Sequence, residues 1–302
     1  MAVTKDGFDG RTYLFIRTNP SDTGMEPLPA GLPGWISPDI AILHPDGTRN
    51  GEANAGIEQK VEVYVNNLGG ITATDAYVEV FVCNPSTVIT PATATLIGSA
   101  FITVPGYGRE SVQLSWIPQE SEAGHRCLIA RVCLPVPPDT FLDGSVFDVY
   151  GDRHVAQRNI NIVKLNGESS KSFMFTIANP GKESGRFSIS ANWKKVAAND
   201  VPVQRAIGCG LVKFASVPLG EVTVRLQPGR QQPLPTTTPI TGSLLGSGTA
   251  TVSLNPQETA QASVNISVNP NAVPGELHLL EVSQWDLLQR KVIGGIWWVI
   301  QA

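Results

Sequence analysis

Apolar and polar residues alternate in short runs along the whole chain. The runs 60–67 and 171–178 are apolar at every second position. A period of two places successive side chains on opposite faces of a strand, so these runs predict β-strands with one buried face. Each run ends in Asn-x-Gly, and a second alternating run follows over 76–82 and 185–193. We therefore expect each pair of runs to form a β-hairpin.

A longer pattern relates the two halves of the chain. The run 111–118 leads through Gly124 into an apolar stretch, and 263–270 leads through Gly275 into another. The Asn-x-Gly turns are 112 positions apart and the two glycines 151, so the second half holds about 39 more residues between these landmarks. The pattern predicts a duplicated unit whose second copy carries an insertion.

The insertion falls within 201–247. It contains a strand-like run at 221–226, followed by the Pro/Thr-rich sequence PGRQQPLPTTTP. Because proline offers no N–H donor to a β-ladder, we expect a surface loop insertion there.

The stretch before Trp35 differs from both copies. One apolar run at 11–17 predicts a strand, and a region rich in proline and glycine follows it. A short polar joint begins at residue 165. We therefore predict three parts: an extended N-terminal segment over 1–34, a first domain over 35–164 and a second domain over 165–302.

These parts favour an all-β fold. Few windows show the 3.6-residue period and caps of helices, whereas short strands and turn signals recur throughout. A length of 302 residues suits two domains, and 29 glycines with 23 prolines indicate many turns. We predict two tandem Ig-like antiparallel β-sandwich domains preceded by the extended segment.

Several motifs resemble the bacterial Ig-like modules of the CARDB and related type. They are WISPDI at 35–40, GHRCLIAR at 124–131, VAQRNI at 155–160, PG at 274–275 and IGGI at 293–296. The resemblance covers 35–302. It implies an Ig-like fold and a non-catalytic role as a spacer, adhesive unit or docking unit.

Composition excludes several classes of partner. Charged residues make up 16% and the formal net charge is −4, so no basic surplus exists to bind nucleic acid. No apolar run approaches the ~18 residues of a membrane span, so we expect no membrane insertion. The first ten residues lack a secretory leader. The cytoplasm, leaderless or particle-associated export, and a trimmed leader with a cell-surface location all stay open.

Two groups of residues could bind a metal. Asp139, Asp143, Asp148 and Asp152 crowd one loop, and Asp143, Asp148 and Asp152 are the candidate calcium ligands, although their spacing is not that of an EF-hand. His125 and Cys127 would face the same side of a strand, with His154 farther on. We interpret the aspartates as solvated carboxylates and turn caps, Cys127 as a buried thiol and His125 as a hydrogen-bonding residue near a turn, so no metal site is predicted and metal binding is the alternative. We predict no cofactor.

Nucleophilic and acid–base chemistry has weaker candidates. Asp22-Thr23-Gly24 matches the aspartic-protease tripeptide but occurs once, so we interpret it as an Asx-turn. The four cysteines, Cys83, Cys127, Cys133 and Cys209, are interpreted as buried thiols, with a Cys83–Cys127 or Cys83–Cys133 bridge as the alternative. No catalytic residue is predicted.

The most unusual run is the apolar stretch 293–300. Trp297 and Trp298 are adjacent, so on a strand they point to opposite faces. Both faces must then be covered, by a partner subunit or by the chain itself, unless an exposed ring stacks on a sugar. Ile296, Trp297 and Trp298 are therefore the predicted partner-facing residues.

These observations favour a non-catalytic structural or interaction protein. It would dock into a larger assembly, such as a surface, a filament or a phage-tail-like particle, through strand edges and apolar strands. Its partners would be other protein subunits, either copies of itself or different chains. The alternative is a carbohydrate- or cell-surface-binding module of adhesin type that binds a glycan. A hydrolase is least supported, because no G-x-S-x-G, P-loop or H-E-x-x-H motif occurs.

Overall fold

A computed structural model of the chain describes residues 7–29, 32–49, 53–120, 126–165, 167–196, 214–227 and 247–302. Across these ranges the chain forms β-strands joined by turns, and helical structure is limited to short 3-10 turns such as η2 (Pro91–Thr93). The predicted all-β class with antiparallel sheets is therefore confirmed. In the same ranges no helix is long and apolar enough to span a membrane.

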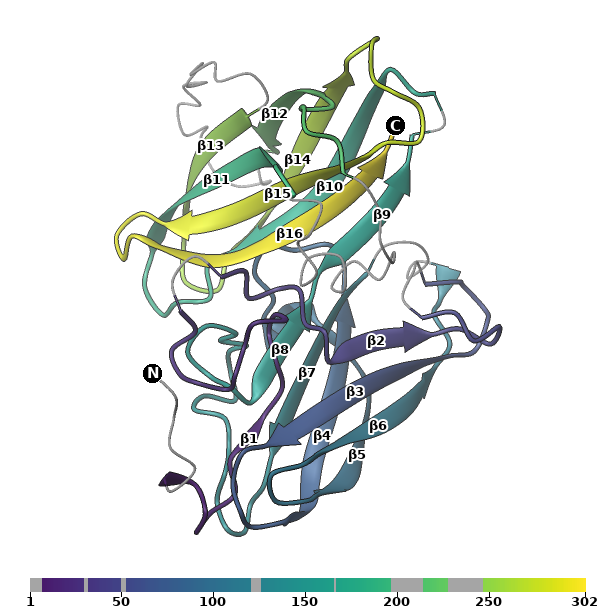
Figure 1. Ribbon diagram of the computed structural model, residues 1–302. Helices are drawn as coiled ribbons and strands as arrows, with labels where there is room; N and C mark the ends of the chain where they lie inside the picture. The colour runs from purple at the N-terminus through teal and green to yellow at the C-terminus, as the bar shows by residue number, and fades with distance from the viewer. Residues whose placement is uncertain are drawn as a thin grey trace. The chain divides into compact units, whose positions relative to one another are not determined.

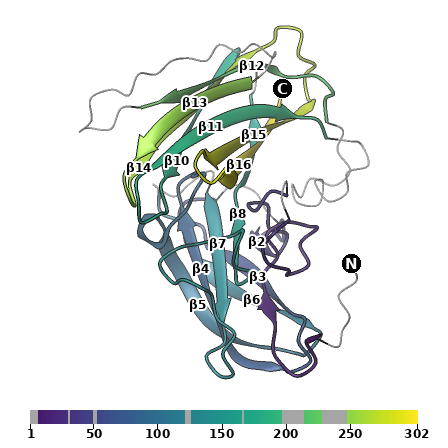
Figure 2. The same cartoon turned by 90° about the vertical axis from the view of Figure 1, so that its left-hand side faces the viewer.

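The first compact unit comprises Met1–Cys83 and Thr90–Arg158 (Figure 1). In one of its sheets, β3 (Gln59–Asn67) pairs with β6 (Arg109–Trp116) on one side and with β2 (Ile40–Leu43) and β1 (Leu14–Phe15) on the other. The second sheet runs in the order β5 (Thr95–Val104), β4 (Ala73–Cys83), β7 (Cys127–Cys133) and β8 (Val155–Arg158). Figure 2 shows β5, β4 and β7 side by side.

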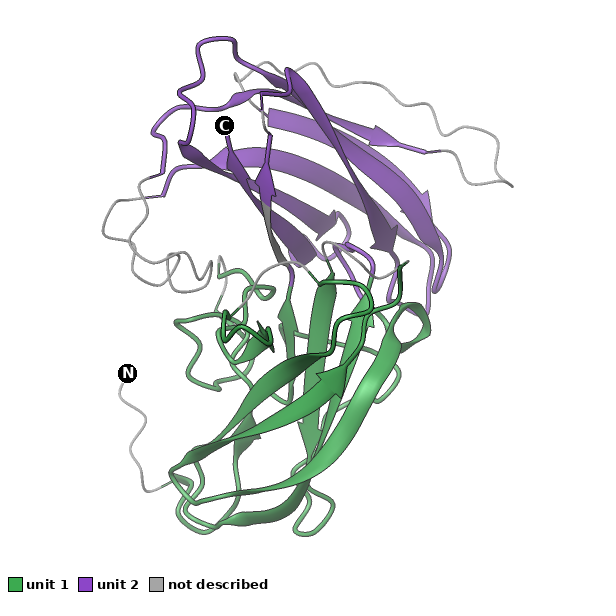
Figure 3. Ribbon diagram, turned by 90° about the vertical axis from the view of Figure 1, so that its right-hand side faces the viewer, with its two compact units in different colours: residues 1–83, 90–158 green, residues 84–89, 159–302 purple. Residues whose placement is uncertain are grey.

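The second compact unit comprises Asn84–Ile89 and Asn159–Ala302 (Figure 3). One sheet has the order β10 (Ser170–Ala178), β14 (Thr259–Val268) and β12 (Gly220–Leu226). The other has the order β13 (Ser247–Leu254), β11 (Gly185–Lys194), β15 (Leu277–Asp286), β16 (Lys291–Gln301) and β9 (Ile160–Lys164). The pairing of β9 with β16 is parallel.

Each unit buries one apolar core between its two sheets. In the first unit Val61 and Val63 of β3 share a core with Val78 and Val80 of β4. In the second, the Phe175 ring lies 5.9 Å from that of Trp298 in the opposite sheet, centre to centre. The alternating residues of each strand supply these contacts, as the period of two requires.

The two units share a strand order. The sheet β5–β4–β7–β8 corresponds to β13–β11–β15–β16, and the pair β3·β6 corresponds to β10·β14. The strand β12 is additional and extends the sheet beside β14. It coincides with the predicted run at 221–226, while 201–213 and 228–246 of the predicted loop insertion lie outside the described residues.

The Asn-x-Gly turns do not close hairpins, contrary to expectation. The strands before and after each turn lie in different sheets, so each turn carries the chain across the sandwich. The Asn67 side chain accepts a hydrogen bond from Gly69 N at 2.9 Å and donates to Val104 O at 3.4 Å. Asn179 makes the equivalent bond with Gly181 N, also at 2.9 Å. Each buried amide therefore ties its turn to neighbouring backbone.

The division between the units differs from the predicted boundary after residue 164. The units divide between Arg158 and Asn159, because β9 joins the sheet of the second unit. A segment of the β4–β5 connection, Asn84–Ile89, also belongs to that unit. There Thr176 N donates to Pro85 O at 2.8 Å, and Thr87 N donates to Thr176 O at 3.0 Å. The second unit is thus assembled from two separate parts of the chain.

Candidate functional site

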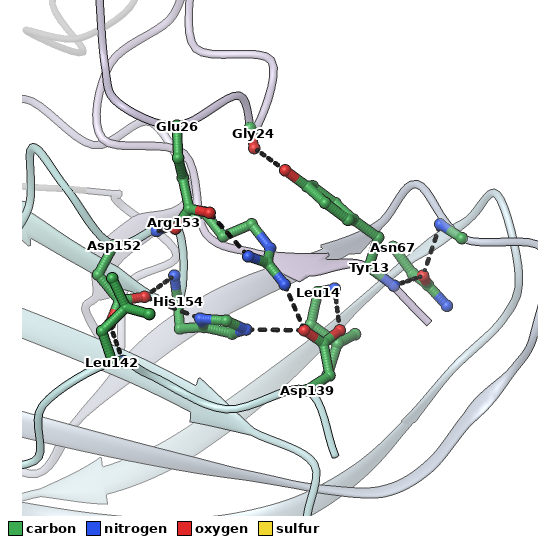
Figure 4. Close-up of polar contacts among 11 residues, drawn as sticks. Tyr13, Leu14, Gly24, Glu26, Asn67, Asp139, Leu142, Asp152, Arg153 and His154 are labelled. Atoms are coloured by element: carbon green, nitrogen blue, oxygen red, sulfur yellow. Dashed lines mark hydrogen bonds and ion pairs between the residues drawn. The ribbon is translucent and has the colours of Figure 1, made fainter. Parts of the chain in front are cut away.

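A cluster of charged side chains, three of them buried, lies in the first unit (Figure 4). It contains Asp139, which follows β7, the consecutive residues Asp152, Arg153 and His154, which precede β8, and Glu26 from the N-terminal segment. Asp139, Asp152 and His154 are all buried. Charged groups are buried in proteins when they are paired, so the pairing decides what this cluster can do.

His154 lies between two carboxylates. Its Nδ1 is 2.7 Å from Asp152 Oδ1, and its Nε2 is 2.9 Å from Asp139 Oδ1. A neutral imidazole has one N–H donor, so one of its nitrogens would turn a lone pair towards a carboxylate. Burial by itself favours the neutral ring, but the hydrogen bonds to Asp139 and Asp152 outweigh it and raise the pKa of His154. This geometry, with an acid at each ring nitrogen, favours the protonated ring, in which both nitrogens donate.

The two aspartates are held in the ionised state. Burial opposes this, yet the hydrogen bonds from His154 and from Leu14 N, together with Arg153, lower the pKa of Asp139. The pKa of Asp152 is lowered despite burial by hydrogen bonds from His154 and from Leu142 N, the latter at 2.6 Å. The cluster is thus ionic on both sides of the imidazole.

Arg153 connects the cluster to the N-terminal segment. Its guanidinium pairs with Asp139 and donates to Glu26 Oε2 at 2.8 Å, and its backbone N donates to Glu26 Oε1 at 2.7 Å. The guanidinium carbon also lies 4.0 Å from the centre of the Tyr13 ring. The Tyr13 hydroxyl donates to Gly24 O at 2.9 Å. Arg153 therefore contacts two well-separated residues of this segment, Tyr13 and Glu26.

A second buried acid fastens the same segment. Asp39, at the start of the first unit's sheet, accepts hydrogen bonds from Arg17 N at 3.0 Å and from Arg17 Nε at 2.9 Å. Its Oδ2 also accepts from Asn66 Nδ2 of β3 at 2.8 Å. The segment predicted to be extended is thus held by side-chain contacts, and among its described residues only Leu14–Phe15 form a strand.

The cluster has a donor set that could hold a metal ion. One ligand atom each from Glu26, Asp152 and His154 lies within 4.8 Å of the other two. A cation there would have to displace the proton on His154 Nδ1 and the contacts of Arg153 with Glu26. Every one of these groups already has an ionic partner, so the arrangement acts chemically as an ion-pair network that joins chain segments.

The candidate calcium ligands Asp143, Asp148 and Asp152 do not form a cluster among the described residues. Asp143 Oδ1 accepts from Ser145 N at 2.8 Å, and Asp148 Oδ1 accepts from Tyr150 N at 3.1 Å. These are turn caps, the alternative interpretation. Asp152 is held by His154. Local turns and the His154 ring therefore satisfy these three carboxylates separately.

The histidine and cysteine candidates are only partly described. His125 lies outside the described residues, and so does Cys209. Cys83 and Cys127 are buried, Cys133 is half-buried, and none of the three is in a disulfide. Asp22 forms the expected Asx-turn, with its Oδ1 accepting from Gly24 N at 2.8 Å.

The predicted partner-facing residues lie inside the chain. Ile296, Trp297 and Trp298 are 0%, 4% and 1% exposed. Trp298 packs in the core against the Phe173 ring, and on the opposite face Trp297 Nε1 donates to Glu281 Oε2 at 2.9 Å. Both faces of β16 are therefore covered by this chain, the alternative left open by the sequence. The assignment of these three residues to a partner surface is corrected.

Comparisons with known proteins found solved structures that match this chain in part. No family model and no curated protein sequence matches the chain. The crystal structure of the CARDB domain of a Pyrococcus furiosus protein in complex with di-metal ions is 19% identical, with a TM-score of 0.26, over 37% of this chain and 78% of that one. A solution NMR structure of that domain is also 19% identical, with a TM-score of 0.26, over 40% and 90%. Red sea bream transglutaminase is 9% identical, with a TM-score of 0.21, over 87% and 31%.

Sequence reasoning missed Glu26 and Arg153. The sequence did hold a signal for Arg153, because Asp152, Arg153 and His154 place an acid and two bases together before a predicted strand. Glu26 carries no local signal, since it lies 127 positions from its partner. The cluster therefore depends on tertiary structure for its membership.

Proposed function

We propose that this protein is a non-catalytic structural subunit that joins a larger assembly through an exposed strand edge. The strand β5 carries the proposal. It is ten residues long and ends the sheet β5–β4–β7–β8, and its side chains Leu96 and Phe101 are 49% and 68% exposed. A long edge strand with exposed apolar side chains is the kind of surface to which another chain adds a strand.

The charged cluster supports the non-catalytic part of this proposal. A general acid or base must reach a substrate proton within hydrogen-bond distance. Asp139, Asp152 and His154 are buried and engaged with one another, with Arg153 or with backbone N–H groups. These side chains use their hydrogen bonds and charges to hold the N-terminal segment in place, which suits a structural role.

The experiment is size-exclusion chromatography with light scattering over a range of protein concentrations. We expect the mass to rise with concentration, and the variant Phe101→Lys to stay monomeric at the highest concentration. The matched control is Leu142→Lys, because Leu142 is 77% exposed but lies in a loop outside the strands. A wild-type chain that remains monomeric throughout, or equal behaviour of the two variants, would contradict the proposal.

The strand order common to both units supports a further part of this proposal, that they are duplicated Ig-like modules. The Asn67 and Asn179 side chains make the same local contacts two and four residues on, with Gly69 N and Ile71 O in one unit and Gly181 N and Glu183 O in the other. Modules of this kind act as spacers, adhesive units or docking units, which is the role proposed here.

Carbohydrate binding is the second candidate function, favoured by one feature. The rings of Tyr77 and Phe101 lie 5.1 Å apart, centre to centre, on neighbouring strands beside the Glu79–Arg131 ion pair. An exposed aromatic surface next to hydrogen-bonding groups can receive the apolar face of a sugar ring. A glycan array with and without calcium tests this, and the variant Tyr77→Ala should lose any signal. Silence under both conditions removes the candidate.

A further inference from the structure

Two cysteines of the first unit face each other across neighbouring strands. Cys83 is the last residue of β4, Cys127 is the first residue of β7, and the two are direct partners in the antiparallel register. Such partners carry their side chains on the same face of a sheet. The two thiols share a hydrogen bond, and neither is in a disulfide.

The backbone spacing at this position suits a disulfide. Facing residues of antiparallel strands have Cα atoms about 4.5–5.5 Å apart, and disulfides span Cα separations of about 4.4–6.8 Å. Cys133 lies six residues farther along β7, or about 20 Å at ~3.3 Å per residue, opposite Tyr77. The register therefore selects Cys127 over Cys133 as the partner of Cys83.

We propose that Cys83 and Cys127 are an oxidative modification site, at which a low-molecular-weight disulfide converts the facing thiols to a cross-strand disulfide. One cysteine thiolate attacks a sulfur of the oxidant and releases one small thiol. The other cysteine thiolate then attacks the mixed disulfide and releases the second small thiol. The protein loses two electrons and two protons, and the oxidant is reduced to two thiols.

The bridge would fasten the point at which the chain leaves the first unit. The residues directly after Cys83 are Asn84–Ile89, which belong to the second unit. A bond from Cys83 to the start of β7 would hold the end of β4 in register there and would limit the freedom of the unfolded chain between residues 83 and 127. Both effects favour the folded state.

The burial of both thiols determines when the disulfide can form. Removal from water, with the neighbouring Cys127 thiol, raises the pKa of Cys83 well above its ordinary value. Because the thiolate is the reactive form, exchange in the folded protein is slow. We therefore expect oxidation during folding, while the strands are still accessible to the oxidant.

The experiment refolds the full chain in a mixture of oxidised and reduced glutathione. Remaining thiols are alkylated under denaturing conditions, and peptide mapping by mass spectrometry identifies the bridge. We expect a peptide linked through Cys83 and Cys127, and an apparent Tm roughly 5–10 °C higher than that of chain refolded with reductant alone. Cys133→Ser should keep both results, whereas Cys83→Ser and Cys127→Ala should each lose them.

The wild-type map decides the question even if a variant fails to fold. Circular dichroism spectra of each variant refolded in reductant show whether its β-structure is retained. Recovery of Cys83 and Cys127 as alkylated thiols, as glutathione adducts or in bridges to Cys133 or Cys209 would overturn the proposal. A bridge without a rise in Tm would overturn its stabilising role.

Discussion

At the scale of single residues, the feature that distinguishes this chain is a histidine enclosed by two acids. Burying an ion in a protein costs several kcal/mol unless its partners offset that cost. Asp139 and Asp152 each receive hydrogen bonds from His154 and from a backbone N–H, so each charge is satisfied from two directions. Removal of one charged residue should therefore lower the free energy of unfolding by more than its own contacts contribute, because its partner is left as an unpaired buried charge.

Substitution of the central imidazolium tests this directly. In His154→Gln the two aspartates lose their shared cation, and we expect the free energy of unfolding of the first unit to fall by about 3–5 kcal/mol. Urea unfolding monitored by circular dichroism measures the change. The control is His44→Gln, because the His44 ring is partly exposed and its Nδ1 lies 3.5 Å from Asn54 Nδ2, with no carboxylate hydrogen-bonded to it among the described residues. A loss in His154→Gln no greater than that of the control would contradict the ionic interpretation.

The same residues predict how stability depends on pH. The pKa of His154 is raised, so its contribution is complete below about pH 6.5 and is lost as the pH rises through the folded value. The pKa values of Asp139 and Asp152 are lowered, so their contributions are present above about pH 4 and are lost as the pH falls.

We therefore expect the first unit to be most stable between about pH 4 and pH 6.5. The urea midpoint of the wild type should fall between pH 6 and pH 9, and that of His154→Gln should fall less over the same range. Equal slopes in the two proteins would show that another group controls this dependence.

At the scale of elements, the segment Asn84–Ile89 belongs to the second unit although the residues on either side of it in sequence belong to the first. It lies along β10, and Thr87 Oγ1 donates to the buried Gln284 Oε1 at 2.6 Å. Asn159 Nδ2 donates to Ser86 O at 2.6 Å. These contacts require close approach, and Gly294 of β16 provides it, since a Cβ there would lie 1.8 Å from Thr87 O.

The variant Gly294→Ala should therefore displace the segment. We expect the unfolding free energy of the second unit to fall by about 1–3 kcal/mol or more, because backbone cannot yield as a flexible side chain can. Gly98→Ala in β5 is the matched control, since a Cβ there would meet Leu114 side-chain atoms at 3.8 Å, an ordinary contact. Thermal unfolding of both variants tests this prediction. Equal Tm values would show that the close approach of Gly294 to Thr87 O does not constrain the second unit.

At the scale of the whole molecule, each unit has its own core, but neither unit is one continuous stretch of the chain. The second unit takes in Asn84–Ile89 from the middle of the first and begins at Asn159. Its strand β9 pairs with the apolar strand β16 along Trp297–Gln301. Strands of this kind, buried on both faces, are stable inside sheets and are prone to aggregate at an exposed edge.

Two fragments test that boundary. Both lack 84–89, so they differ only in β9 and the preceding Asn159: one comprises residues 159–302 and the other residues 165–302. We expect the longer fragment to give more soluble protein and a higher Tm, because it keeps β16 between two neighbours. If 165–302 is equally soluble and equally stable in circular dichroism melts, β9 has no structural role in the second unit.

Much of the strand content followed from local pattern. The runs 60–67 and 171–178 are β3 and β10 almost residue for residue, because burial of one face imposes a period of two. The same pattern could not say which strands pair. The turns after Asn67 and Asn179 cross between sheets, and a turn motif alone does not distinguish a crossing from a hairpin.

The candidate site was less accessible to sequence reasoning. Asp152 and His154 were visible as candidates, but their partners depend on which loops meet, and Glu26 reaches Arg153 only in the folded chain. Trp297 and Trp298 were correctly expected on opposite faces of a strand, yet their covering by the same chain was one of three open alternatives.

The amino-acid sequence by itself determined the all-β class, the strand positions and the buried faces, because these depend on side-chain periods within single segments. Tertiary structure decided the crossing turns, the place of Asn84–Ile89 and β9, and the pairing of His154 with Asp139 and Asp152. Those features depend on contacts between residues far apart in the chain, and such contacts form only once the whole core determines which segments become neighbours.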